Sequence, residues 1–442
     1  MLEMDYRERV SLLLKLRDVV KEYEKEMYRA LSKDLGKSAY ESYYTEIGLI
    51  YNEINYTLKF LKSWMQEKTL PTPLFHMPAV STVVREPFGR VLIISPWNFP
   101  FQLSLIPLVN AWAAGNVVTI KPSEVAGSCE KVLYRMLTEN FHTSRVRVIT
   151  GGPEATMDLL GKKFDFIFYN GSRRVGKIVY EKAAKLMTPV CLQMGGKSPA
   201  IVDENCNLEM AAKRIILGKF TNCGQNALAP EYILVPKSKK EKFIKLLDHY
   251  IKEFYGENPV ESEDYGCIIS LYHFYRLLDL IEHQTIILGG EFDTMKLKIS
   301  PTVVEENSFC SEMMKDEIFG PILPIITYEG FDQAIEVIER FPTPPACYIF
   351  TKNRLHEEYI KNNYRCGSVC VNDVMIQGTT SHLPVGRVGS SGMGRYHGKA
   401  GYDTFSNVKS IMKKRNIAES NLKYPPYDKN KMPLLKRFMK TK

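Results

Sequence analysis

The feature that most constrains the fold is a regular alternation of short apolar runs and longer amphipathic segments that begins at residue 91. The runs are rich in β-branched and aromatic residues, and most intervals between them are long enough for a helix. They are VLIIS (91–95), VVTI (117–120), VRVIT (146–150), FDFIFY (164–169) and PVCLQM (189–194). Strands that alternate with helices predict a parallel, doubly wound sheet. Such a sheet binds ligands at the carboxyl ends of its strands.

A second α/β stretch follows from about residue 207 and continues to about residue 400. Residues 4–67 show helical alternation of charged and apolar side chains, and KDLGKS (33–38) interrupts them between two long helices. A chain of 442 residues is also too long for one ordinary hydrophobic core. The sequence therefore predicts an α/β protein with two domains and a helical lead-in.

The formal net charge is +9, and part of the excess lies in KKR (413–415) and KNKMPLLKRFMKTK (429–442). A basic tail of this kind is either a patch for an anionic membrane or polyanion, or a solvated terminus. We favour the solvated terminus, because no nucleic-acid motif or aromatic-interleaved basic face accompanies it.

The nine cysteines show no paired spacing, and charges interrupt the apolar runs at the N-terminus. No run approaches the roughly 18 apolar residues that cross a bilayer. We therefore expect a cytoplasmic protein without a membrane span. Metal sites are not expected either, because the histidines form no H-E-x-x-H motif and Cys366 and Cys370 lack partner ligands.

Two segments after predicted strands have side chains suited to a nucleotide. IKPSE (120–124) places Lys121 and Glu124 where they can bond to ribose hydroxyls or a phosphate. YNGSRRVGK (169–177) opens a helix, so its N–H groups can face a pyrophosphate. The glycine spacing there differs from the dinucleotide motif G-x-G-x-x-G. CLQMGGKS (191–198) ends like a P-loop, but Cys191 stands where that loop needs glycine, so a nucleotide triphosphatase is not expected.

Two further loops suggest acyl chemistry. TNCGQNALAPEY (221–232) has the form of a loop that carries a catalytic cysteine two positions after its Gly-Gln pair, yet that position is Ala227. SPWNFP (95–100) holds Asn98 on a proline-bounded corner. Its amide can donate to a developing oxyanion, and the alternative is a plain turn.

Taken in order, SPWNFP, IKPSE, VITGG, YNGSRRVGK, QMGGKSP, NCGQNALAPEY, EIFGPILP and GSSGMGRYHGK resemble the motifs of the aldehyde dehydrogenase superfamily. The chain is most similar to its class 3 branch, which KEFYGENP, VCVNDV, YHGKAGYDTFS and YPPY also resemble. The resemblance runs from about residue 5 to 437. Each motif alone is weak, and the ordered set is specific.

The resemblance implies oxidation of an aldehyde through a cysteine thiolate, with hydride transfer to NAD(P) and hydrolysis of a thioester by a base-activated water. It implies an oxyanion donor at Asn98. It also implies NAD as the cofactor, with NADP possible, since the charge of Glu124 opposes a 2′-phosphate. The implied cofactor contacts are Lys121, Ser123 and Glu124 at the adenosine ribose, Gly171, Ser172 and Val175 near the pyrophosphate, and Glu317 and Phe319 at the nicotinamide ribose and ring.

Two departures concern the chemistry itself. Ala227 occupies the position of the family's nucleophile, and Gln193 occupies the position of the glutamate that serves as its base. A methyl group cannot add to an aldehyde, and an amide does not accept a proton from water. Smaller departures are Asn170 and Asn226, where threonine is usual, and Arg387, where glycine is common and where a guanidinium can meet an anionic ligand or narrow the tunnel.

Three interpretations remain open. The chain is an aldehyde dehydrogenase altered at two positions, a natural non-catalytic member that binds NAD(P) or aldehyde as a sensor, scaffold or subunit, or an enzyme of residual or altered activity through Cys223. We expect near inactivity in aldehyde oxidation, because losing the nucleophile of a catalytic set costs about 10⁴–10⁶ in rate.

The resemblance also implies a domain plan and a homodimer. Residues 1–74 and 87–206 would form the N-terminal helices and the Rossmann-type dinucleotide-binding domain, and residues 207–400 the catalytic domain. Residues 75–86 with 401–416 would form a β oligomerisation flap, and residues 417–442 a basic tail. The expected partners are a small aldehyde or its analogue and a second copy of the chain, without nucleic acid.

Overall fold

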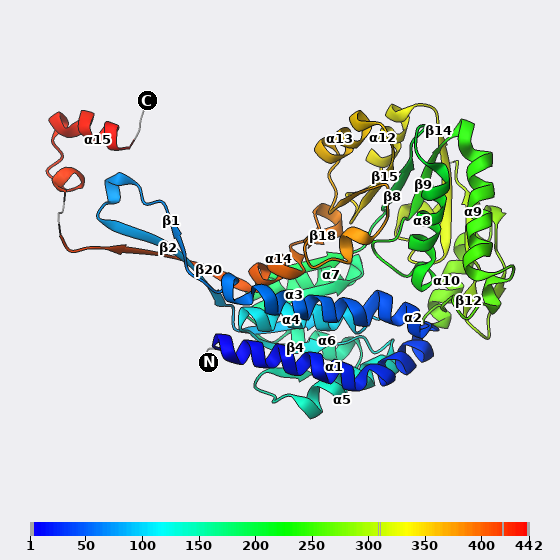
Figure 1. Cartoon of the computed structure of the whole chain (residues 1–442), viewed down its shortest axis with the longest axis horizontal. Coiled ribbons are helices and arrows are strands. Elements are labelled where there is room, and N and C mark those ends of the chain that lie inside the picture. The colour runs from blue at the N-terminus through cyan, green and yellow to red at the C-terminus, as the bar shows by residue number, and fades with distance from the viewer. Residues whose placement is uncertain (1–3, 308, 310, 418–419, 440–442) are drawn as a thin grey trace.

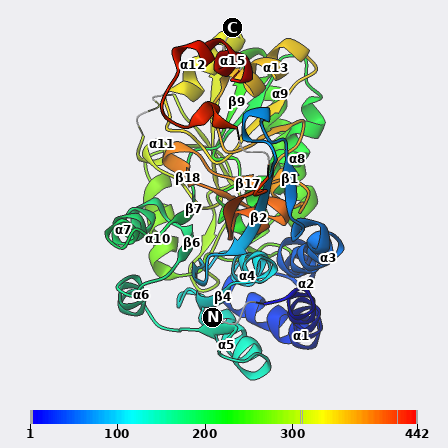
Figure 2. The ribbon, with the colours of Figure 1, turned by 90° about the vertical axis from the view of Figure 1, so that its left-hand side faces the viewer.

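The computed structural model describes residues 4–307, 309, 311–417 and 420–439. Two α/β units form the body, and a narrow β-arm extends from it (Figure 1). The predicted fold class is confirmed: the chain has a doubly wound Rossmann-type unit, a second α/β unit and a small β-flap. Figure 2 views the molecule from the side of the arm.

The first unit contains a six-stranded sheet in the order β18-β7-β6-β3-β4-β5. Its five core strands are parallel, and β18 pairs antiparallel with β7. Their bounds are β3 Arg90–Ile94, β4 Val117–Lys121, β5 Val146–Val148, β6 Phe166–Gly171, β7 Val190–Met194 and β18 Gly392–Met393. The apolar runs of the sequence thus became these core strands.

Helices cover both faces of this sheet because successive strand residues point to opposite sides. In β3, Val91 and Ile93 pack under α1, α3, α4 and α5, whereas Leu92 and Ile94 pack under α6 and α7. The bounds are α1 Tyr6–Leu35, α2 Ala39–Ser42, a π-helix Tyr43–Ile47, α3 Gly48–Trp64, α4 Gln102–Ala114, α5 Gly127–Asn140, α6 Pro153–Leu160, α7 Arg173–Lys185 and α14 Gly398–Thr404. Gly36 ends α1 in the left-handed conformation at φ 65°, as the KDLGKS break predicted.

The second unit contains a seven-stranded sheet in the order β10-β13-β14-β9-β8-β15-β16, parallel except for β10. The strands are β8 Pro199–Val202, β9 Tyr232–Pro236, β10 Thr285–Leu288, β13 Thr302–Glu305, β14 Ile322–Tyr328, β15 Cys347–Phe350 and β16 Val369–Val371. The helices are α8 Leu208–Phe220, α9 Lys240–Tyr255, α10 Leu271–Ile281, α11 Glu312–Lys315, α12 Phe331–Glu339 and α13 Arg354–Asn363. Short ladders join β11 Phe292–Asp293 to β12 Lys298–Ile299 and β17 Val385–Gly386 to β19 Arg395–Tyr396.

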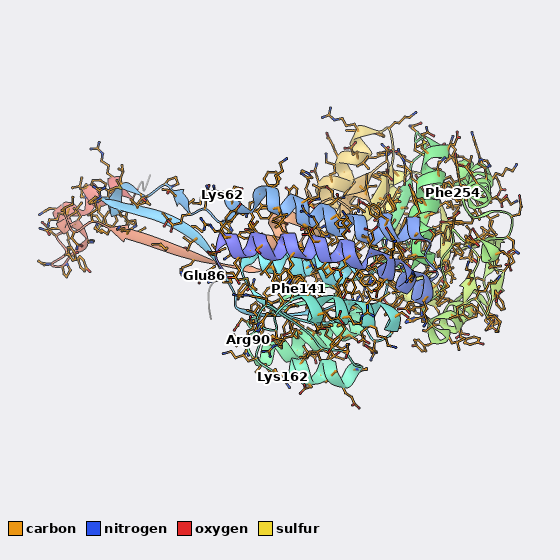
Figure 3. All side chains as sticks on the ribbon, turned by 60° about the horizontal axis from the view of Figure 1, so that its bottom comes forward. Lys62, Glu86, Arg90, Phe141, Lys162 and Phe254 are labelled. Atoms are coloured by element: carbon orange, nitrogen blue, oxygen red, sulfur yellow. The ribbon has the colours of Figure 1, made fainter. Side chains whose placement is uncertain are left out.

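The arm consists of β1 Lys68–Leu70, β2 Ala79–Pro87 and β20 Ser406–Lys414. The last two pair antiparallel along their whole length, from Ala79 opposite Lys414 to Pro87 opposite Ser406. Glu86 marks the root of the arm in Figure 3, and α15 (Met432–Phe438) of the basic tail lies near its far end in Figure 1. Among the described residues, no helix is long and apolar enough to cross a membrane.

The chain passes from the first sheet to the second before residue 206, the expected end of the dinucleotide-binding domain. The chain leaves the first sheet at Met194, and β8 already belongs to the second sheet at Pro199. Near the C-terminus, β18 returns to the first sheet and α14 packs on α4. The crossing segment, residues 195–198, and the returning Gly-rich segment therefore both lie where the two units meet.

Candidate functional site

A cavity of about 350 Å³ is lined by residues from both units. Its wall includes the start of α3, the Asn98 corner, the end of β6, α8, the loop of residues 226–228, the segment 373–379 and the side chain of Arg387. Phe254 of α9, labelled in Figure 3, also lines it. Most of the wall is apolar, and the volume is typical of a small-molecule site.

Ala227 reaches this cavity from a tight turn that follows α8. The turn Thr221–Gly224 contains two non-glycine residues in the left-handed region, Asn222 at φ 54° and Cys223 at φ 52°. Buried amides hold the turn. Asn222 Nδ2 donates to the main-chain oxygen of Asn98 at 2.8 Å. Gln225 Nε2 donates to the main-chain oxygens of Asn222 and Cys267 at 3.0 Å each. Ala227 is half-buried and presents its methyl group at the cavity wall.

Asn98, the expected oxyanion donor, lines the same cavity. Its Nδ2 donates to the Gln225 oxygen at 2.9 Å, and its buried Oδ1 has no partner among the described residues. A buried ion pair supports this corner: Lys37 Nζ lies 2.8 Å from Glu46 Oε1 and donates to the Asn98 oxygen at 3.2 Å. Glu46 Oε2 accepts from the main-chain nitrogen of Phe101 at 2.9 Å. The sequence does not reveal this support, because Lys37 and Glu46 lie far from Asn98 along the chain.

Gln193 lies on β7, close to the site but not in the cavity wall. Its Nε2 donates at 3.3 Å to Cys191 Sγ, a weak acceptor, and at 3.4 Å to the Gly394 oxygen, while its buried Oε1 has no partner among the described residues. The amide is therefore held weakly between Cys191 on its own strand and Gly394 of the Gly-rich segment.

Glu317 lies directly against the crossing segment between the two sheets. A Cβ placed on Gly195 would come within 2.0 Å of Glu317 Oε2, so only glycine admits the carboxyl group there. Glu317 Oε1 is buried and has no partner among the described residues. Burial, followed by repulsion from Glu231 and Asp316, raises the pKa of Glu317 to about 8. A buried oxygen without a partner beside a glycine cradle suits a ligand hydroxyl.

A buried charge cluster positions the EIFGP loop that carries Glu317 and Phe319. Glu231 Oε2 accepts from the Ile318 nitrogen at 2.7 Å and from Lys197 Nζ at 3.2 Å. Lys219 Nζ lies 3.7 Å from Glu231 Oε1. Burial alone would raise the pKa of Glu231, but the charges of Lys219 and Lys197 lower it. The motif QMGGKSP does not by itself predict the roles of Gly195 and Lys197, because these depend on contacts with Glu317 and Glu231.

Phe319 has a left-handed backbone, φ 49°, which turns its ring toward Trp97. The two rings meet edge to face with centroids 5.3 Å apart. Trp97 in turn lies 5.1 Å from the His273 ring. An aromatic surface thus stands beside the Asn98 corner, where a flat heteroaromatic ring can pack.

The predicted adenosine contacts lie at the carboxyl end of β4. Lys121 Nζ donates to the Pro122 oxygen at 2.5 Å and to Glu124 Oε2 at 3.2 Å. Ser123 accepts from the Val125 nitrogen at 3.3 Å, and Glu124 lies near Gly152, with Oε1 3.9 Å from a Cβ placed there. Gly171 ends β6, and Ser172 caps α7 by accepting from the Val175 nitrogen at 3.4 Å. The N-terminus of α7 therefore opens at the carboxyl end of β6, on the same edge of the sheet as the end of β4, which suits a pyrophosphate.

Cys223 does not reach the cavity. It is fully buried in the core of the second unit, and burial raises the pKa of its thiol well above the ordinary range. Among the described residues there is no cluster of His, Cys, Asp or Glu that could hold a metal ion.

A doubly wound sheet joined to a second α/β unit, with a cavity where the two meet, is the arrangement of a two-domain α/β protein with a dinucleotide-binding type of fold. The sequence profile of the aldehyde dehydrogenase family matches residues 1–411. The chain belongs to the aldehyde dehydrogenase family, in its class 3-like branch.

Curated relatives cover nearly the whole chain. The 4,4'-diaponeurosporen-aldehyde dehydrogenase of Staphylococcus aureus is 44% identical over 434 residues, which are 98% of this chain and 94% of the relative. The aldehyde dehydrogenase family 3 member H1 of Arabidopsis thaliana is 41% identical, covering 98% and 90%.

Solved structures agree with the fold. The substrate-bound state of Staphylococcus aureus AldH has 43% identity and a TM-score of 0.96, over 98% of this chain and 95% of that chain. The NAD⁺ complex of an aldehyde dehydrogenase from Bacillus cereus has 26% identity and a TM-score of 0.83, over 94% and 85%.

Proposed function

We propose that this chain binds NAD(P) and an apolar aldehyde or its analogue on an intact family scaffold, but is close to inactive in aldehyde oxidation. The observation that carries the proposal is the methyl group of Ala227 in the cavity wall, at the position that the motifs assign to the nucleophile. Without a thiolate no covalent adduct forms with the aldehyde carbon. Such a loss costs about 10⁴–10⁶ in rate.

The second lost function is the base. Gln193 stands at the glutamate position, and its amide cannot take a proton from water. Its contacts with Cys191 and Gly394 also keep it outside the cavity wall. Because the base acts only after the nucleophile, its loss adds little to the loss at Ala227.

The cofactor part of the proposal rests on groups that fit NAD(P). The unpartnered Oε1 of Glu317 in the Gly195 cradle suits the nicotinamide ribose, and Phe319 with Trp97 suits the ring. Lys121, Ser123 and Glu124 suit the adenosine ribose, and the start of α7, with Gly171, Ser172 and Val175, suits the pyrophosphate. When bound, NAD(P) supplies a hydride acceptor. Glu124 favours NAD, since its charge opposes a 2′-phosphate.

The experiment measures two properties of the unmodified chain, of Ala227→Cys and of Ala227→Cys with Gln193→Glu. The first is NAD and NADP binding by calorimetry, and the second is reduced-cofactor formation over a panel of apolar aldehydes. We expect cofactor binding in all three proteins, no turnover by the unmodified chain, and turnover that appears with Ala227→Cys and rises in the double variant.

Two results would contradict the proposal. Strong turnover by the unmodified chain would show that another group replaces the thiolate, and loss of that turnover in Cys223→Ser would identify it. Absence of cofactor binding in all three proteins would leave the dehydrogenase scaffold as ancestry alone.

We also propose that the chain is a homodimer in which the arm joins the two copies. We further propose that it is a cytoplasmic protein. β20 is an edge strand, and Val408, Ile411 and Met412 on it are exposed. Exposed apolar edge strands tend to pair with another chain. Ile411→Lys should yield monomers in sedimentation equilibrium, whereas Met187→Lys, at an 89% exposed site on the body, should not.

A further inference from the structure

Arg387 places a fixed cation in the wall of an otherwise apolar cavity. Its Nε donates to the Met194 oxygen at 2.9 Å, and its Nη1 donates to the Gly386 oxygen at 3.0 Å. Nη2 donates to no acceptor among the described residues, although the side chain lines the cavity. Two hydrogen bonds therefore hold the guanidinium plane, and one nitrogen remains for a ligand.

The other charges of the wall already have partners. Arg214 Nε lies 3.6 Å from Asp373 Oδ2, and both residues line the cavity. Lys213 Nζ lies 3.2 Å from Glu253 Oε1. No carboxylate of the described residues lies within 4.0 Å of Arg387 in an ion pair.

The carboxyl group that interacts electrostatically with Arg387 is that of Glu317, which lies on the proposed cofactor side and outside the cavity wall. Because the pKa of Glu317 is raised to about 8, that group is largely protonated at neutral pH and does not neutralise the guanidinium. Arginine itself stays charged in proteins. A half-buried cation without a counter-ion favours an anionic ligand.

The remaining wall decides what the anion is attached to. The apolar side chains extend from the Asn98 corner to the outer helices and include Leu49, Phe99, Leu103, Leu217, Phe254 and Ile376. A chain of methylene groups gains about 0.8 kcal/mol for each group buried on such a surface. Inorganic anions and sugar phosphates gain nothing there.

We propose that the cavity binds an aliphatic carboxylate, with its head group at Arg387 and its chain along the apolar wall. This inference rests on the proposed function, because a site without nucleophile would hold the ligand without converting it. A carboxylate neutralises the guanidinium through charge-assisted hydrogen bonds, whereas an aldehyde of the same chain offers one neutral acceptor. The chain therefore retains the acid in preference to the aldehyde.

The test compares ligands of one chain length on the unmodified full-length protein. Calorimetry without cofactor measures the dissociation constants of decanoate, methyl decanoate, decanal and decanol. We expect decanoate to bind about 10- to 100-fold more tightly than the three uncharged ligands, the range for a hydrogen bond to a charged group. Equal affinities for the four ligands would overturn the proposal.

Variants assign the effect to Arg387. Arg387→Met should reduce decanoate affinity to the level of decanol and leave decanol binding unchanged. Arg387→Lys, which keeps the charge but loses the planar fork, should retain part of the preference. The matched control is Arg395→Met, since Arg395 is exposed on the neighbouring β19 and does not line the cavity.

Failure of this inference and failure of the proposed function give different results. Aldehyde turnover by the unmodified chain overturns the proposed function, whatever the binding data show. A decanoate preference that survives in both Arg387 variants overturns the inference and leaves the proposed function standing. If Arg387→Met does not fold, the ligand series on the unmodified protein and on Arg387→Lys still tests whether Arg387 causes the preference for decanoate.

Discussion

Arg387 Nε donates a hydrogen bond to the main-chain oxygen of Met194 at 2.9 Å, which ties the Gly-rich C-terminal segment to the end of β7. The same segment pairs with β7 through Gly392 opposite Gln193. Arg387 and Gln193, which the motif resemblance implies to be departures from the family pattern, thus lie on one shared structural junction.

The first prediction concerns the amide of Gln193. Gln193→Met should change stability by less than about 1 kcal/mol, because it removes two long contacts and one unpartnered oxygen and keeps the shape. Gln225→Met is the matched comparison, since that buried amide donates two bonds at 3.0 Å and accepts one from Ile269 at 3.1 Å. It should cost about 1 kcal/mol or more per bond. Thermal unfolding measures both, and a larger loss for Gln193→Met would contradict the assignment.

The second prediction concerns the Gly195 cradle. Gly195→Ala should weaken NAD(P) binding by about 10-fold or more, equivalent to roughly 1.4 kcal/mol, because its methyl group displaces the Glu317 carboxyl group. Gly127→Ala is the control, since a Cβ there meets nothing within 4 Å. Cofactor titration by calorimetry distinguishes them. Unchanged binding in Gly195→Ala would mean that Glu317 takes no part in holding the cofactor.

The third prediction concerns pH. The pKa of Glu317 is raised from 4.5 to about 8, so the folded protein holds a proton that the unfolded chain releases. The stabilising contribution of this proton is complete below about pH 4.5 and is lost as the pH rises to about 8. Glu317→Gln removes this dependence. The melting temperature of Glu317→Gln minus that of the parent should therefore increase from pH 5 to pH 8. For Glu154→Gln, at an exposed site, this difference should stay constant over the same range.

Sequence patterns predicted the strands of the first sheet because alternation and strand length are local properties. They did not reveal that the chain leaves this sheet at Met194, because PAIV follows QMGGKS without an intervening helix and either sheet could receive it. The motif resemblance named Asn98, Glu317 and Phe319 as site residues, and their roles stay predictions. It could not locate the Lys37–Glu46 pair or the carboxyl cradle at Gly195, since these depend on contacts between segments far apart in sequence.

The fourth prediction concerns the thiol of Cys223. Because Cys223 is fully buried and burial raises the pKa of its thiol, the native protein should not react there with iodoacetamide near neutral pH. The half-buried thiols of Cys206, Cys267 and Cys366 should react first, and all should react after denaturation. Peptide mass spectrometry identifies the modified sites. Rapid native labelling of Cys223 that an aldehyde prevents would revive the interpretation of a substitute nucleophile.

The fifth prediction concerns the ion pair beneath the Asn98 corner. Lys37 and Glu46 have fully buried side chains with 2.8 Å between Nζ and Oε1, and Lys37 also donates to the Asn98 oxygen. Lys37→Met leaves a buried carboxylate without its cation, which typically costs about 3–5 kcal/mol. Lys37→Met with Glu46→Gln removes that charge as well and should recover part of the loss.

An exposed pair provides the control for this fifth prediction. Lys162 and Asp158 lie 2.6 Å apart on the surface, and Lys162 is labelled in Figure 3. Lys162→Met should cost less than about 1 kcal/mol, since solvent screens exposed pairs. Denaturant unfolding measures all three variants. If Lys37→Met costs no more than Lys162→Met, the buried pair does not support the corner, and the position of Asn98 must depend on its contacts with Asn222 and Gln225.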